Sequence, residues 1–164
     1  MEQLTIPASI TEKEERYSLL IRQIKSLLSK EDNVLSNLSN LTAALNDGLD
    51  YVSWVGFYLF DGEKLYLGPF QGKAACTEIN TGSGVCGTAA SKLEPVIVPD
   101  VSKFPGHIAC DPGSKSEIVI PLIKKDGRLF GVLDLDSAFL NSFNETDKKN
   151  LEEICNYLIN NILN

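Results

Sequence analysis

Two of the three Asp-Gly dipeptides, at residues 61–62 and 126–127, each separate two short runs of branched and aromatic residues. Asp-Gly is a preferred turn of β-hairpins, because glycine accepts the positive φ that such a turn requires. The flanking runs are residues 51–60 with 64–70, and residues 117–123 with 129–136. Hairpins pair their strands antiparallel, so these four runs predict an antiparallel sheet.

Helical periodicity lies on both sides of these runs. Residues 11–29, 32–47 and 144–163 carry leucine and isoleucine at helical spacing, and Thr11 with Glu14 predicts a capping box on the first helix. Residues 82–92 predict a short helix entered through glycines, 95–98 a short strand, and 99–116 a long functional loop. The order is typical of an α+β fold, a single antiparallel sheet with helices packed on one face. No repeat or linker divides the chain, and we expect one domain over residues 1–164.

The charge and hydrophobic pattern exclude several classes of partner. The formal net charge is -7, which argues against nucleic acid or an anionic membrane. The polar N-terminal segment and the lack of a long apolar run predict a cytoplasmic protein. Cysteines in that compartment serve catalysis, redox sensing or metal binding more often than structural disulfides.

The four cysteines divide into two groups. Cys155 lies on the apolar stripe of the last predicted helix, which predicts a core position. Cys76, Cys86 and Cys110 lie in irregular, glycine-rich or loop contexts. A helix N-terminus would lower the pKa of Cys86, and a protonated His107 would favour a Cys110 thiolate. An attacking thiol with a resolving thiol predicts redox chemistry.

Zinc is the alternative use of such residues. Structural zinc sites contain close cysteine pairs, whereas Cys76, Cys86, His107 and Cys110 are separated by nine, twenty and two residues. The spacing therefore predicts no metal site.

A second group of candidates is acidic and aromatic. The period of two places Asp134 and Asp136 on one face of their strand, and Glu117 joins them if the neighbouring strands pair. Trp54 and Tyr58 likewise share a face. The simpler interpretations are a solvated strand face and ordinary core packing. An aromatic wall beside carboxylates would also suit a small ligand with an ammonium group.

Several sequence blocks, in order, resemble the free methionine-(R)-sulfoxide reductases. They are WVGFYLF (54–60), LGPFQGKAAC (67–76), GSGVCGTAA (82–90), VPDVSKFPGHIACDPGSKSEIVIPL (98–122) and GVLDLDS (131–137). The resemblance covers residues 30–140 and implies the GAF fold. It further implies an enzyme, an oxidoreductase that reduces free L-methionine (R)-S-oxide without a bound cofactor. Thioredoxin would be the external reductant, and the state a monomer or homodimer.

The resemblance also implies roles for individual residues. Cys110 would attack the sulfoxide sulfur, Cys86 would be the preferred resolving thiol, and Cys76 a second resolver or relay. Trp54 and Tyr58 would surround the substrate methyl. Glu117, Asp134 and Asp136 would divide two tasks: a protonated carboxyl donates to the sulfoxide oxygen, and an ionised one holds the ammonium. Backbone N–H groups of the loop would suit the substrate carboxylate.

Two other classes share part of this pattern. GAF domains also serve as small-molecule sensors, usually fused to an output domain that this sequence does not contain. A redox switch without turnover would need the thiols but not the acidic pocket.

Overall fold

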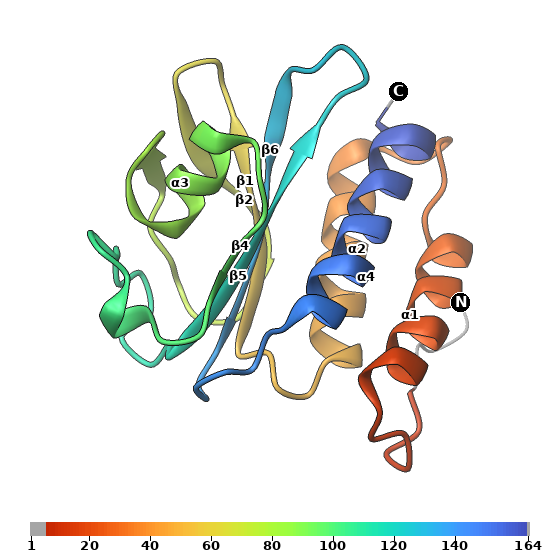
Figure 1. The fold of residues 1–164 in the computed structure, drawn as a ribbon. Helices are drawn as coiled ribbons and strands as arrows, with labels where there is room; N and C mark the ends of the chain where they lie inside the picture. Colours follow the sequence, from red (N-terminus) through yellow and green to blue (C-terminus); the bar gives the residue numbers. More distant parts are fainter. Residues whose placement is uncertain (1–5, 164) are drawn as a thin grey trace.

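Six antiparallel strands form one sheet in the computed structural model, which describes residues 6–163 (Figure 1). The strand order is β3-β2-β1-β6-β5-β4. The strands are β1 (Trp54–Phe60), β2 (Lys64–Gln71), β3 (Glu78–Asn80), β4 (Val96–Val98), β5 (Ser116–Ile123) and β6 (Leu129–Ser137). The two predicted hairpins, β1-β2 and β5-β6, are both present, and β1 pairs with β6 between them.

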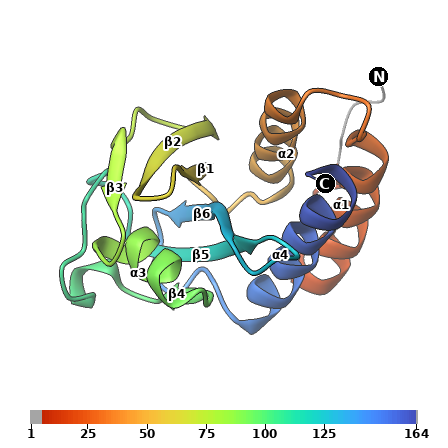
Figure 2. The same cartoon turned by 90° about the horizontal axis from the view of Figure 1, so that it is seen from above.

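The helices cover the two faces of the sheet unequally. Helices α2 (Val34–Gly48) and α4 (Glu145–Tyr157) pack on one face, and α1 (Lys13–Leu27) packs against these two helices on the side away from the sheet (Figures 1 and 2). The last helix continues as a π-helix over Leu158–Ile162. The predicted α+β arrangement is confirmed, with one addition: α3 (Gly84–Lys92) lies on the opposite face, beside the long loop after β4. Among the described residues, no helix is long and apolar enough to cross a membrane.

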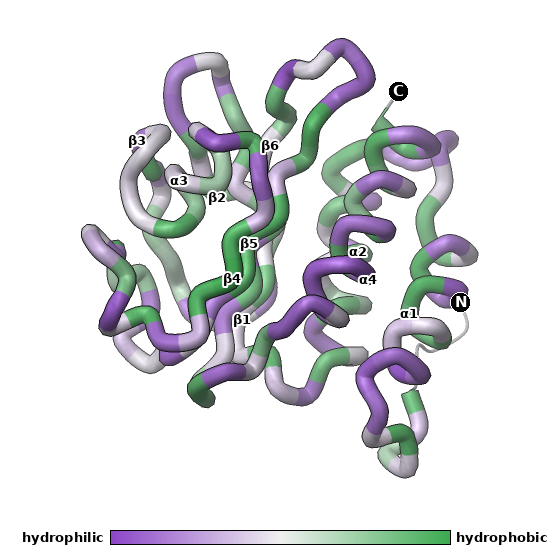
Figure 3. The backbone as a smooth tube through the Cα atoms, viewed as in Figure 1, coloured by the Kyte–Doolittle hydropathy of each residue, from purple (hydrophilic) through white to green (hydrophobic). Residues whose placement is uncertain are grey.

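Alternate residues of the strands feed two separate hydrophobic clusters. Phe57, Leu133 and Leu135 face the three large helices and belong to the main core. Tyr58 and Val132 point the other way, into a smaller cluster with α3. This alternation follows from the period of two along a strand. The helices have a hydrophobic side of their own. Figure 3 shows this in α1 and α4, where hydrophobic and hydrophilic segments recur along each helix. The second, smaller cluster is where the candidate residues gather.

Two local features differ from the sequence prediction. The prediction of a capping box at Thr11 and Glu14 is wrong, because α1 begins after Glu12 and no side chain caps the helix. The buried Arg16 instead holds the entry to the helix by donating to the backbone oxygen of Ile10 at 2.7 Å. Strand β3 was not predicted, because Ile79 is its one apolar residue and three residues give no readable alternation.

A buried carboxylate ties the first helix to the last. Asp147 of α4 is fully buried and accepts hydrogen bonds from the hydroxyls of Tyr17 and Tyr51. It also pairs with the ammonium of Lys13 and accepts from the backbone N–H of Asn144 at 2.8 Å. Removing the carboxylate takes this acceptor from the two hydroxyls and from the backbone N–H, whereas Lys13 keeps the backbone oxygen of Ser142.

We therefore expect Asp147→Ala to lower the free energy of unfolding by about 3–5 kcal/mol, the usual cost of removing one member of a buried ion pair. Glu153→Ala is the matched control, because Glu153 also joins α4 to α1, through Lys25, but its side chain is 51% exposed. That change should cost no more than about 1 kcal/mol. Urea unfolding of both variants measures the difference, and equal losses would contradict the assignment.

Candidate active site

Three carboxyl groups meet on the sheet face that carries α3. Strand pairing places Glu117 of β5 opposite Asp136 of β6, and Asp134 lies two residues further along the same strand. The side chains of Glu117 and Asp134 are buried, and that of Asp136 is half-buried. The predicted face is confirmed, and the alternative of a solvated strand face is wrong.

Burial changes the protonation of this acidic cluster, defined as Glu117, Asp134 and Asp136. Burial raises the pKa of Asp134 well above its usual range, and the charges of Asp136 and Glu117 raise it further. Burial and then the charge of Asp136 raise the pKa of Glu117. Burial raises the pKa of Asp136 to about 6, although a hydrogen bond from Ser114 opposes the rise. The cluster therefore retains protons at pH values at which exposed carboxyl groups have lost theirs.

Trp54 and Tyr58 form an aromatic wall beside the cluster. Their rings stack with centroids 6.1 Å apart, and Trp54 lies opposite Asp136 in the strand register. The indole N–H of Trp54 donates to the backbone oxygen of Lys73, and the Tyr58 hydroxyl donates to that of Cys76, both at 2.9 Å. The two rings thus line the site and also position the segment that carries Cys76.

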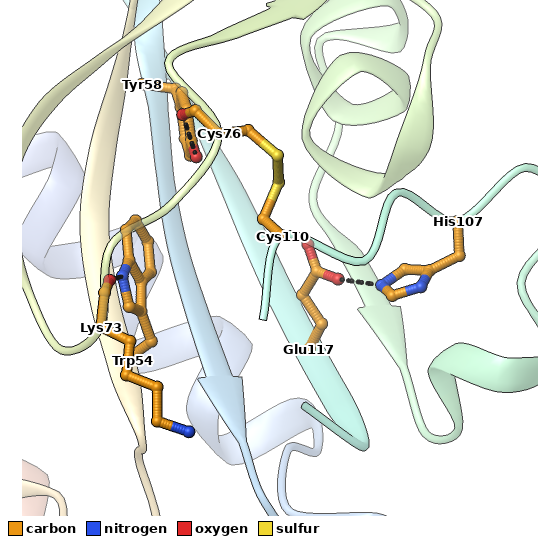
Figure 4. Close-up of a disulfide and its surroundings, with 7 residues drawn as sticks. All are labelled: Trp54, Tyr58, Lys73, Cys76, His107, Cys110 and Glu117. Carbon is orange, nitrogen blue, oxygen red and sulfur yellow. Dashed lines mark hydrogen bonds and ion pairs between the residues drawn. A yellow bond between two sulfur atoms is a disulfide. The ribbon is translucent and has the colours of Figure 1, made fainter. Parts of the chain in front are cut away.

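A disulfide between Cys76 and Cys110 joins that segment to the long loop, with the Cα atoms 5.4 Å apart (Figure 4). The predicted approach of the loop cysteines is confirmed for this pair. Both residues are half-buried, and Tyr58 and Glu117 lie on either side of the bridge in Figure 4. Cysteines separated by 34 positions therefore meet at the edge of the acidic cluster.

Cys86 has a different environment from the one predicted. It is a free, buried thiol in the first turn of α3. Burial raises its pKa well above the usual value, and the charges of Asp134 and Glu117 add to the rise. The predicted lowering of this pKa by the helix N-terminus is wrong, because desolvation and nearby acids outweigh the helix dipole. The disulfide partner of Cys110 is Cys76, whereas the sequence favoured Cys86 as the resolving thiol. Cys155 is a buried core residue, as predicted.

The entry to α3 explains why Cys86 lies so deep. Gly84 begins the helix with φ +61°, a conformation that side-chain-bearing residues rarely adopt. A Cβ at this position would lie 3.1 Å from Cγ1 of Ile108. Glycine therefore allows the loop to pack closely over the first turn of the helix.

Two loop residues contact the cluster directly. The Nε2 atom of His107 lies 3.5 Å from a carboxyl oxygen of Glu117, so this histidine contacts a member of the acidic cluster (Figure 4). The hydroxyl of Ser114 donates to Asp136 at 2.5 Å. Sequence reasoning missed Ser114, since a serine in a polar loop carries no distinguishing pattern.

These groups enclose a cavity of about 30 Å³. Its polar and sulfur-containing lining consists of Tyr58, Ser83, Cys86, His107, Cys110, Asp111, Ser114, Glu117, Asp134 and Asp136. A smaller hollow continues from it toward Trp54 and Ala75. The structure thus brings together every candidate site residue: Cys76 bonded to Cys110 at the edge, and the others around the cavity.

The donor atoms of Cys86, Glu117 and Asp134 lie within 4.8 Å of one another and could hold a metal ion. This set differs from the one considered from spacing, because Cys76 and Cys110 are bonded to each other. Besides metal binding, the site can carry out thiol–disulfide chemistry, because Cys76 and Cys110 lie beside carboxyl groups that hold protons.

Comparison with known proteins identifies the family. Residues 34–162 match the GAF domain family. The chain is 56% identical over 149 residues to GAF domain-containing protein A of Dictyostelium discoideum, covering 90% of this chain and 93% of that protein. It is 44% identical over 142 residues to the free methionine-R-sulfoxide reductase of Escherichia coli, covering 87% and 86%.

A solved structure supports the same grouping. Free methionine-R-sulfoxide reductase from Neisseria meningitidis, in complex with its substrate, superposes with a TM-score of 0.86 at 42% identity, covering 95% of this chain and 93% of that one. The chain therefore belongs to the GAF domain family and, within it, to the free methionine-(R)-sulfoxide reductases, which are oxidoreductases.

Proposed function

We propose that the protein reduces free L-methionine (R)-S-oxide to L-methionine, using Cys110 as the nucleophile and Cys76 as the resolving thiol. The observation that carries the proposal is the Cys76–Cys110 disulfide at the edge of a cavity lined by acids and an aromatic ring. A disulfide between these two residues is the product that such a reaction leaves in the enzyme.

The proposed reduction of the sulfoxide has two chemical steps. The Cys110 thiolate attacks the sulfoxide sulfur while the sulfoxide oxygen takes up a proton, which gives an adduct with an S–S bond. The hydroxyl then moves to the sulfur of Cys110 as the S–S and S–O bonds break, so that methionine leaves with the electron pair and Cys110 is left as a sulfenic acid. The Cys76 thiol then attacks the sulfur of Cys110, and the oxygen departs as water. Thioredoxin returns the disulfide to two thiols in this proposal, and no bound cofactor takes part. This cycle suits the reducing conditions of the cytoplasm.

The acidic cluster has two tasks in the proposal. A sulfoxide oxygen leaves readily only when it receives a proton, and a protonated carboxyl group of the cluster is the donor. An ionised member holds the substrate ammonium. Backbone N–H groups of the loop bind the substrate carboxylate, while Trp54 and Tyr58 surround its methyl group.

The size of the cavity supports one order for two steps, reduction of the disulfide and binding of the substrate. A volume of about 30 Å³ has room for about two water molecules, which is far less than an amino acid needs. The disulfide holds the loop over the site. Reduction of the disulfide therefore precedes substrate binding, because it releases Cys110 from the segment that carries Cys76.

A coupled assay tests the function. With thioredoxin, thioredoxin reductase and NADPH, we expect one NADPH to be oxidised for each free methionine (R)-sulfoxide reduced, and none with the (S) epimer. Dithiothreitol in place of thioredoxin separates the chemistry from the reductant. If methionine forms with dithiothreitol but not with thioredoxin, the role of thioredoxin as the reductant is refuted and the reductase activity is not. No methionine with either reductant would favour a sensor or a redox switch and refute the enzyme.

A further inference from the structure

Three donor groups from three elements converge in the cavity without taking part in the disulfide. Cys86 comes from α3, Glu117 from β5 and Asp134 from β6, and all three are buried. Their sulfur and oxygen atoms lie within 4.8 Å of one another. In the proposed reaction Cys86 forms no bond, so a buried thiol stands beside two carboxyl groups with no assigned task.

One oxygen of this set is unpaired. The Oδ1 atom of Asp134 is buried and has no hydrogen-bond partner among the described residues, 6–163. Leaving a buried acceptor without a partner is costly, so such an atom indicates a ligand. Asp134 lines the cavity, which has room for an ion and a water molecule but not for an amino acid.

The donors select the ion. A thiolate with two carboxylates suits Zn²⁺, whereas Mg²⁺ and Ca²⁺ prefer oxygen ligands alone. Zinc bonds of about 2.0–2.3 Å in a tetrahedron place neighbouring donors about 3.5 Å apart. Side chains now within 4.8 Å reach that spacing by small rotations. His107, 3.5 Å from Glu117, is placed to orient that carboxylate as an outer partner.

We propose that the protein in its disulfide form binds one Zn²⁺ in this cavity, through Cys86, Glu117 and Asp134, with water as the fourth ligand. The thiol proton of Cys86 and the protons held by Glu117 and Asp134 pass to the buffer when the ion binds. The ion shares Glu117 and Asp134 with the acidic cluster of the proposed reaction, but it binds the disulfide form, which has no room for the substrate, and zinc is not a cofactor of the reaction.

The test uses the disulfide form, in which the free cysteines are Cys86 and Cys155. Titration with Co²⁺ should give a thiolate-to-cobalt absorption band that saturates at one ion per chain and disappears when Zn²⁺ is added. Cys86→Ser should lose the band. Cys155→Ala, the matched control, should keep it, because Cys155 lies in the main core. Asp134→Asn should weaken binding more than tenfold, because it removes a direct carboxylate ligand, and loss of an outer partner of a ligand alone costs about 10–100-fold.

A measurement on the unmodified chain guards against variants that fail to fold. Zn²⁺ should raise the unfolding temperature of the disulfide form, and the same concentration of Mg²⁺ should not. The proposal is overturned if the unmodified chain gives no cobalt band, if Cys86→Ser retains one, or if Zn²⁺ leaves the unfolding temperature unchanged.

Discussion

We expect the replacement of Cys110 by serine to abolish methionine formation, even within a single turnover. A serine hydroxyl is not ionised near neutral pH and cannot take up the sulfoxide oxygen as a sulfenic acid. The measurement is a quenched reaction of fully reduced protein with excess free methionine (R)-sulfoxide and no recycling reductant. We expect no detectable methionine, against about one methionine per chain for the unmodified protein.

The other two cysteines of the site give matched variants. Cys76→Ser should release one methionine per chain and then stop, with an added oxygen on Cys110 that mass spectrometry detects. Cys86→Ser should continue over several turnovers with a reductant, because Cys76 is the thiol bonded to Cys110. Stalling of Cys86→Ser with continued turnover of Cys76→Ser would reverse the assignment. First-turnover activity in Cys110→Ser would move the nucleophile elsewhere.

The features that sequence could predict are those governed by local periodicity. The Asp-Gly turns define the two hairpins. The alternation of Leu133, Asp134 and Leu135 places the acid on the opposite face from the core. Such predictions hold because a one-residue shift would turn Leu133 and Leu135 away from the main core and place the carboxyl groups in it.

The features that sequence could not predict depend on tertiary distance. The choice between Cys76 and Cys86 depends on which one the loop reaches, and no spacing encodes that distance. The pKa of Cys86 was predicted to fall, on the helix N-terminus alone. In the fold, burial and the acids of the neighbouring strands have the larger effect. Residues that converge from separate elements change one another's chemistry, and a linear pattern does not contain those neighbours.

The acidic cluster should be as important to the rate as the resolving chemistry. In Glu117→Gln and Asp136→Asn the side chain keeps its size but can neither carry a carboxyl proton to the sulfoxide oxygen nor hold an ammonium as an anion. Loss of proton transfer costs about 10²–10⁴-fold. We expect single-turnover methionine formation to fall within that range for whichever of the two supplies the proton. The other should lose about 10- to 150-fold, the cost of one charge-assisted contact.

The control variant is Glu78→Gln, which neutralises an acid of β3 whose side chain is 59% exposed and pairs with Lys64. It should keep the rate of the unmodified chain, and the unfolding temperatures of all three variants should show that each is folded.

A peptide containing methionine sulfoxide provides the second control, since it has no free ammonium for the cluster to hold and carries chain on both sides. The unmodified protein should reduce it at least tenfold more slowly than the free amino acid, from the loss of one such contact. Near-native rates in both acid variants, or equal rates on peptide and free amino acid, would show that the cluster does not bind and protonate the substrate.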